Sequence, residues 1–170
     1  MLIFVNIDGC SRACFTYGKH PKIAAMQLLN YAYKQKNDWT CGPAVVRIIL
    51  DYYGIEATVA ELVKQLRTTR SGTTHKQILR LFRKKGLKFI AKENASISNL
   101  KKYTKNHWVI VAYRIPFQGD YHYSIVKNIN SKKIIFHDTW FGSNHGYTLK
   151  NFHKNWRDDE SSRWMLAIKK

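Results

Sequence analysis

The sequence has few acidic residues. Only 11 aspartates and glutamates stand against 29 lysines and arginines, which gives a formal net charge of +18. This excess predicts long-range attraction to an anionic partner, which could be an acidic protein or peptide substrate, nucleic acid or an anionic membrane surface. The basic residues are spread along the chain and no nucleic-acid-binding motif accompanies them, so a specific nucleic-acid function is not favoured.

Long hydrophobic runs are also missing. No stretch approaches the roughly 18 apolar residues of a membrane span, although 45% of the residues are hydrophobic. The opening Met-Leu-Ile-Phe-Val-Asn-Ile-Asp has no basic leader and meets Asp8 too early for a secretory signal. We expect a single domain over residues 1–170, with residues 1–30 as an extension without an assigned role. We also expect cytoplasmic residence, or export by a route that needs no cleaved signal.

Cysteine is scarce as well, with Cys10, Cys14 and Cys41 the only three. This odd count is too low for a disulfide scaffold and favours a reducing compartment with a free thiol. Cys10 and Cys14 together with His20 lack the spacing and the fourth ligand of a zinc site. The glycines occur singly and no nucleotide or flavin motif is present, so we expect no cofactor.

The strongest local pattern surrounds Cys41, at the start of a segment whose apolar spacing predicts a buried helix. Apolar residues recur there at helical spacing, at Ala44, Val45, Ile48, Ile49 and Tyr52. Asp38 or Thr40 could cap the start of this helix, Pro43 is tolerated in a first turn, and Gly54 fits the position after its end. Cys41 is therefore expected in the first turn.

A cysteine in that position is a candidate nucleophile, because the unpaired amides and the helix dipole favour a thiolate over a thiol. The alternative is a small buried side chain without chemistry. Gln35 lies shortly upstream of Cys41. Its amide and the backbone N–H of Cys41 could donate to the same carbonyl oxygen and so form an oxyanion hole.

Helix signals dominate the first half of the remaining chain and strand signals the second half. Capping boxes at Thr58–Glu61 and Thr74–Gln77 predict two helices, and a short helix is expected over 98–103. Strands are expected over residues 87–91, 107–113, 121–127, 133–137 and 164–168. Over residues 1–34 we expect a strand at 2–7 and a helix at 23–33. Helices followed by strands predict an α+β fold with a cleft between the halves.

His122 is the best candidate base for Cys41, because it begins an apolar strand on the same face as Ser124. A hairpin turn centred on Asn130 would place His122 directly opposite Asp138, which could then orient the imidazole. His137 would point to the opposite sheet face and is expected to be packed or solvated.

These residues resemble the bacteriocin-processing peptidases that cut double-glycine leaders, a papain-like cysteine peptidase family. Gln35, Asp38, Cys41, Gly42 and Ala44 match the nucleophile signature of that family. Tyr-His-Tyr-Ser-Ile-Val at 121–126 resembles its histidine strand. Phe-His-Asp-Thr-Trp-Phe-Gly at 136–142, followed by Phe152 and Trp156, resembles its aspartate segment.

The resemblance covers Gln35 to Trp156 and implies a papain-like α+β fold. It also implies a cysteine peptidase with Cys41 as nucleophile, His122 as base, Asp138 as orienting residue and Gln35 in the oxyanion hole. Thr139 stands where the family usually has proline, which changes the loop after the carboxylate. Many members are the first domain of a membrane exporter and this chain carries no transporter, so leader processing is not implied.

Two other functions are compatible with the same residues. Acyl transfer or glutamine deamidation would form the same acyl-enzyme and differ only in the acceptor or the amide attacked. A non-catalytic domain could instead bind peptide or nucleic acid through the basic surface, although such a domain would not need the four catalytic residue types.

Overall fold

The computed structural model describes residues 34–170 of the chain. The strand expected at 2–7, the helix expected at 23–33, and the residues Cys10, Cys14 and His20 lie outside the described residues. Within residues 34–170, no helix has the length and apolarity needed to span a bilayer.

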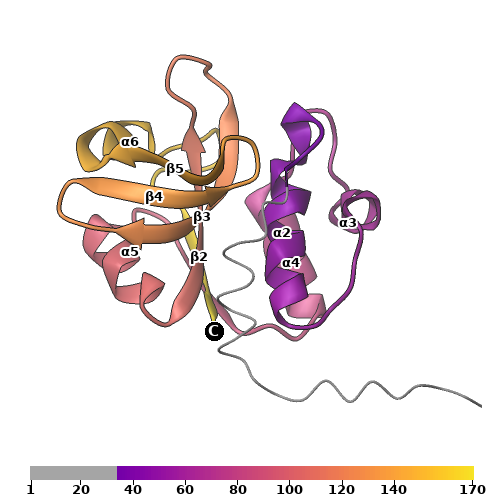
Figure 1. Cartoon of the computed structure of the whole chain (residues 1–170). Helices are drawn as coiled ribbons and strands as arrows, with labels where there is room; N and C mark the ends of the chain where they lie inside the picture. The colour runs from indigo at the N-terminus through magenta and orange to yellow at the C-terminus, as the bar shows by residue number, and fades with distance from the viewer. Residues whose placement is uncertain (1–33) are drawn as a thin grey trace, which may run out of the picture.

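The first part of the described chain forms a helical layer (Figure 1). A 3-10 turn, η1 (Asp38–Thr40), leads directly into α2 (Cys41–Tyr52), which is followed by α3 (Val59–Leu66) and α4 (His75–Lys84). Both predicted capping boxes are present: Thr58 accepts a hydrogen bond from the Glu61 amide, and Thr74 accepts one from the Gln77 amide. These boxes satisfy backbone donors that the first turn of a helix leaves unpaired.

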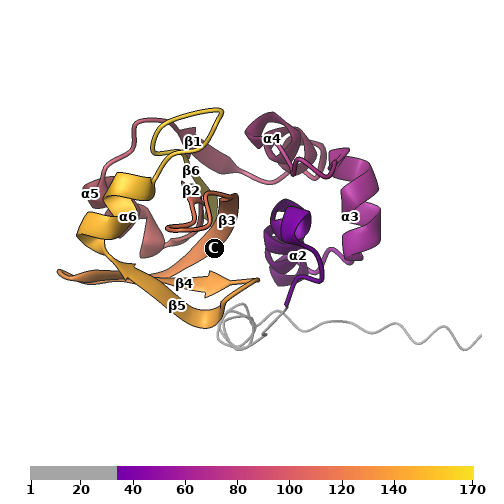
Figure 2. The same ribbon diagram turned by 90° about the horizontal axis from the view of Figure 1, so that it is seen from above.

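The second part forms a six-stranded antiparallel sheet in the order β1-β6-β2-β3-β4-β5. The elements of this part are β1 (Phe89–Lys92), α5 (Ile97–Thr104), β2 (His107–Arg114), β3 (Tyr121–Ile129), β4 (Lys133–Asp138), β5 (Gly142–Thr148), α6 (Leu149–Asn155) and β6 (Met165–Lys169). Figures 1 and 2 show α2, α3 and α4 on one side of the sheet and α5 and α6 on the other. The predicted α+β architecture is confirmed.

Two hydrophobic cores lie on the two faces of the sheet, and β2 contributes to both. Trp108 and Ile110 pack with the buried side of α2 and α4, whereas Val109 and Val111 pack with Phe152 of α6 and the opposite core. This alternation along one strand is the period of two that a sheet covered on both faces requires. The helical layer is thus fixed against the sheet by apolar burial.

The helix α2 is buried more completely than its apolar stripe predicts. Val46 and Leu50 lie off that stripe and are nevertheless fully buried. Even the charged side chain of Arg47 is partly buried. The sheet covers one side of this helix, and α3 and α4 pack near the other (Figure 2). The site at its first residue therefore rests on an element that is held from several directions.

Two elements of the sheet half, β5 and α6, were not predicted from the sequence. The edge strand β5 has the sequence Gly-Ser-Asn-His-Gly-Tyr-Thr, which lacks the apolar alternation of a half-buried strand. The helix α6 has only seven residues and one fully buried side chain, Phe152. The strand β5 depends on its pairing with β4, and α6 has a local signal at its start, where the Thr148 hydroxyl accepts a hydrogen bond from the Asn151 amide (3.2 Å).

Candidate active site

Cys41 is the first residue of α2 and is buried, with its side chain at the cleft between the helical layer and the sheet. The prediction that Asp38 or Thr40 caps this helix is wrong, since no side chain caps it. The Thr40 hydroxyl instead donates to the Asn37 carbonyl (3.0 Å) within the 3-10 turn. The first amides of α2 therefore stay without a side-chain acceptor beside the sulfur.

Gly42 is required by the close approach of two chain segments. A Cβ atom at this position would lie 2.6 Å from both Cβ and Oγ1 of Thr73 in the loop between α3 and α4. Thr73 is itself held by a hydrogen bond between its hydroxyl and that of Thr68 (2.7 Å). The glycine after the cysteine thus lets this loop pack against the first turn of α2.

The structure brings His122 and Asp138 together, as predicted, but through a different register. Ile125 pairs with His137 and Val126 with Phe136, which places Ser124, and not His122, opposite Asp138. The turn lies at residues 131 and 132, where the Asn130 side chain accepts hydrogen bonds from two backbone amides, and β3 carries a bulge before residue 128.

The prediction that His122 lies directly opposite Asp138 is therefore wrong, because the observed register differs from the predicted one by two residues. A displacement of two keeps every side chain on the same sheet face, and diagonal neighbours remain within reach of a long side chain. His122 Nε2 consequently lies 3.1 Å and 3.0 Å from the two carboxylate oxygens of Asp138. His137 is buried, which selects the packed alternative of the prediction that it is packed or solvated.

Asp138 is the most heavily hydrogen-bonded side chain of the site. Its carboxylate oxygens accept from His122 Nε2, the Ser124 hydroxyl, the Tyr113 hydroxyl (3.2 Å) and the backbone amides of Trp140 and Phe141 (both 2.8 Å). Burial raises the pKa of this carboxyl, but the hydrogen bonds from His122, Ser124 and the backbone outweigh burial and hold the pKa well below its usual range. Asp138 is therefore an anion at neutral pH.

Opposing effects also act on His122. Burial lowers the pKa of its imidazole, while the hydrogen bonds and charges of Asp138 and Cys41 raise it, with a net value of about 10. Because Nε2 faces Asp138, the nitrogen left for the Cys41 sulfur is Nδ1. The arrangement favours an imidazolium between a carboxylate and a sulfur.

Gln35 is buried beside the same cleft and is held at both ends of its amide. Its Oε1 accepts from the Thr139 hydroxyl (2.6 Å) and its Nε2 donates to the Asn37 carbonyl (2.8 Å). The backbone of Gln35 also donates to the Thr139 carbonyl (2.8 Å). The residue that replaces the usual proline of the resembling family thus contacts the candidate oxyanion-hole side chain directly.

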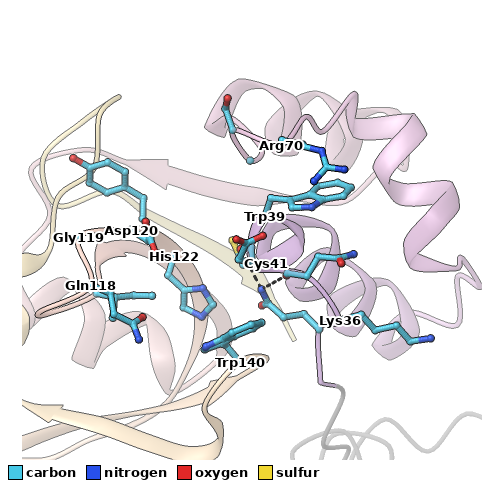
Figure 3. Close-up of a pocket in the computed structure, with 16 residues that line it drawn as sticks. Lys36, Trp39, Cys41, Arg70, Gln118, Gly119, Asp120, His122 and Trp140 are labelled. Atoms are coloured by element: carbon cyan, nitrogen blue, oxygen red, sulfur yellow. Dashed lines mark hydrogen bonds between the residues drawn. The ribbon is translucent and has the colours of Figure 1, made fainter.

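The cleft around these residues has a volume of about 740 Å³. Figure 3 shows Cys41 and His122 near its middle, with Trp39 on one side and Trp140 on the other. The loop between β2 and β3 contributes Gln118, Gly119 and Asp120. The sequence did not predict Gln118, Gly119 and Asp120 as lining residues, because they lie in a loop without a periodic pattern. Within the described residues, no group of three or more His, Cys, Asp or Glu side chains could hold a metal ion.

Comparisons with known proteins identify the family and the fold. An uncharacterized protein of Methanothermobacter thermautotrophicus is 29% identical over 109 residues, which cover 64% of this chain and 70% of that protein. The peptidase domain of Streptococcus ComA, a bi-functional ABC transporter involved in quorum sensing, shares the fold. It has a TM-score of 0.64 and 20% identity, with coverage of 80% of this chain and 95% of that one.

A second solved structure with the same fold is a double glycine motif protease from an AMS/PCAT transporter in complex with the leader peptide. It has a TM-score of 0.61 and 17% identity, with coverage of 80% of this chain and 88% of that one. The sequence profile of the peptidase C39 family matches residues 30–159, which is most of the chain and includes all four candidate residues. The chain therefore belongs to the peptidase C39 family and has its papain-like cysteine peptidase fold.

Proposed function

We propose that this chain is a cysteine peptidase that hydrolyses peptide bonds through Cys41, His122 and Asp138. The observation that carries the proposal is the buried contact of His122 with Asp138, across the cleft from a cysteine at the first residue of α2. A peptide is the ligand in the solved double glycine motif protease with this fold, which supports a peptide as substrate class here.

In the proposed reaction, the Cys41 thiolate attacks the carbonyl carbon of the scissile bond and a C–S bond forms. The charge that develops on the carbonyl oxygen is stabilised by the Cys41 amide and by the side chain of Gln35. His122 then gives its proton to the leaving amine as the C–N bond breaks. Water hydrolyses the thioester, with His122 accepting a proton from that water, and the free thiolate returns.

Asp138 has a positioning role in this scheme. It holds Nε2 of His122, so that Nδ1 faces the sulfur, and its charge stabilises the imidazolium. The five donors around the carboxylate keep it ionised in a buried environment, where an isolated charge would be strongly disfavoured.

The test is turnover of a fluorogenic peptide library by the wild-type chain and by Cys41→Ala and His122→Ala variants. We expect cleavage by the wild type only, and an acyl-enzyme mass on Cys41 after rapid acid quench. Products whose new carboxyl carries an added nucleophile other than water would show acyl transfer. Equal turnover by Cys41→Ala would contradict the site.

A further inference from the structure

A smaller pocket opens beside the sulfur of Cys41 and has carboxylates in its wall. Its volume is about 100 Å³ and it shares Cys41 and His122 with the main cleft. Other parts of its wall come from the loop between α3 and α4, including Gly72 and Thr73, and from the start of β3. The segment before β6 closes it with Asp158, Asp159 and Glu160. A side chain near the scissile bond of a bound peptide would meet this pocket.

The acidic residues of this basic chain gather around the cleft. Six of the chain's 11 carboxyl side chains lie at the two pockets or at the histidine between them: Asp38, Asp120, Asp138, Asp158, Asp159 and Glu160. Acidic side chains are thus concentrated at the cleft of a chain whose net charge is positive. Clustered like charges repel one another, so this grouping is unfavourable unless another group of the site offsets it.

Two of the three pocket carboxylates are fixed by the helical layer. The side chain of Asp158 is almost fully buried, and its Oδ2 lies 2.9 Å from His75 Nε2, while its other oxygen accepts from the Glu160 and Ser161 amides (2.9 and 2.8 Å). Glu160 accepts from the His75 amide at the first turn of α4 (3.0 and 3.2 Å). His75 is in turn stacked on Trp164 with ring centroids 4.0 Å apart. This segment is therefore built rigidly into the fold.

The third carboxylate, that of Asp159, is exposed, and the Tyr121 hydroxyl is its hydrogen-bond partner. Within residues 34–170, no lysine or arginine forms an ion pair with Asp158, Asp159 or Glu160. Among the described residues, the basic side chain in contact with Asp158 and Glu160 is therefore His75 (2.9 Å and 3.9 Å), and Asp159 has no such contact. The basic residues that line the main cleft are Lys36 and Arg70, which Figure 3 places on the helical side of Cys41, whereas Asp120 lies on the sheet side.

We propose that this pocket binds a lysine or arginine side chain of the substrate, within about two residues of the scissile bond. This inference rests on the proposed function and adds a substrate class to it. The nucleophile at the pocket mouth places a peptide there, and Asp159 and Glu160 supply the charge that a cationic side chain would complement. The basic surface elsewhere can attract an acidic partner at long range, while the pocket selects the residue next to the reacting bond.

The charge of the pocket can be measured without a substrate. Methanethiosulfonate reagents of similar size but opposite charge are reacted with the full chain, and mass spectrometry assigns the rate at Cys41. The rate of each reagent at Cys41 is divided by its rate with a free thiol in solution. After this correction, we expect the trimethylammonioethyl reagent to react about tenfold faster than the sulfonatoethyl reagent. Asp159→Asn and Glu160→Gln should each reduce this preference, while Glu93→Gln, an exposed carboxylate outside both pockets, should leave it unchanged.

The substrate preference is then measured with fluorogenic tetrapeptides in which one position at a time is fixed as arginine, glutamate or leucine. We expect the highest kcat/KM with arginine at one position next to the cleaved bond, and a loss of about tenfold for that peptide alone in Asp159→Asn. Equal cleavage of all three peptides, or an unchanged preference in Asp159→Asn, would overturn the inference. If no peptide is cleaved, the proposed hydrolysis is wrong, and the reagent ratio still decides whether the pocket selects a cation.

Discussion

The two walls of the cleft position their functional groups by different means. On the sheet side, His122 and Asp138 belong to a buried polar network that includes two hydroxyls and two backbone amides. On the helical side, Cys41 owes its position to the apolar burial of α2 and to the loop that packs on Gly42. A buried polar network is destabilised when one partner is lost, because the remaining polar groups are left unsatisfied, whereas the position of α2 depends on many apolar contacts.

Replacing Cys41 should have the largest effect on turnover and almost none on the fold. Cys41→Ala removes the sulfur at the end of a helix that is held by other residues, so we expect activity to fall roughly 10⁴- to 10⁶-fold. Peptide turnover and the midpoint of urea unfolding measure the two effects. Retained activity would move the nucleophile elsewhere. A large loss of stability would show that the sulfur also holds the helix.

Replacing Asp138 should damage both activity and stability, because it breaks the network of the sheet side. Asp138→Asn puts an amide among five donors and removes the charge that raises the His122 pKa, so we expect turnover to fall roughly 10²- to 10⁴-fold. Ser124→Ala is the matched control: it removes one donor to Asp138 and should cost less than about tenfold. Equal effects of the two variants would assign the network a purely structural role.

Replacing Gln35 tests a residue that joins the two walls of the cleft, because its side-chain amide accepts a hydrogen bond from Thr139 after β4. Gln35→Ala should reduce kcat by roughly a hundredfold if the side chain stabilises the oxyanion. Thr139→Val keeps the size of its side chain and removes the hydrogen bond to Gln35, so a smaller fall in kcat is expected with an unchanged Gln35. If Gln35→Ala changes the unfolding midpoint but leaves kcat as in the wild type, Gln35 has a structural role and is not part of the oxyanion hole.

Alkaline pH should lower the free energy of unfolding, because His122 on the sheet side of the cleft loses its proton. The pKa of His122 is raised from about 6.5 in the unfolded chain to about 10 in the folded protein. A group whose pKa is raised on folding stabilises the fold fully at pH values below its pKa in the unfolded chain. This contribution to the free energy of unfolding is lost as the pH rises through the pKa of the folded protein. Urea unfolding from pH 6 to 11 should therefore show a loss of stability in the wild type that His122→Ala lacks. Parallel curves for the two proteins would contradict the raised pKa.

The smallest effect on activity is expected far from the cleft. Thr58→Ala breaks the capping box of α3 and should cost about 1 kcal/mol of unfolding free energy without changing kcat/KM. Thermal unfolding and peptide turnover check this expectation. A marked fall in activity would mean that α3 transmits strain to α2 and that the helical wall is less tolerant than its packing implies.

The sequence predicted much of this arrangement because the relevant signals are local. The apolar stripe after Cys41 and the threonine caps of α3 and α4 depend on residues three or four positions apart. The contact of His122 with Asp138 was predicted from an incorrect register, and it survived because a displacement of two residues preserves the sheet face. The position of the turn itself followed from the Asn130 side chain, which the periodicity of the strands does not report.

Other features could not be read from local patterns. The hydroxyl of Tyr113 and the amides of Trp140 and Phe141 meet Asp138 only after the sheet has formed. The acidic wall of the small pocket joins residues 158–160 to the loop at Gly72, more than 80 positions earlier in the chain. Such long-range contacts depend on tertiary packing, so composition alone pointed to a basic surface and missed the acidic side chains beside the nucleophile.

The most direct test of the proposed site is the rate of iodoacetamide labelling of Cys41 as a function of pH, with mass spectrometry assigning the modified residue. The references are the same chain unfolded in urea and the His122→Ala variant. We predict that Cys41 of the folded wild type reacts at pH 5 to 6 at least about tenfold faster than both references, because a thiolate is paired with the His122 imidazolium. A folded wild type whose Cys41 follows the unfolded chain across the whole pH range would contradict the peptidase mechanism.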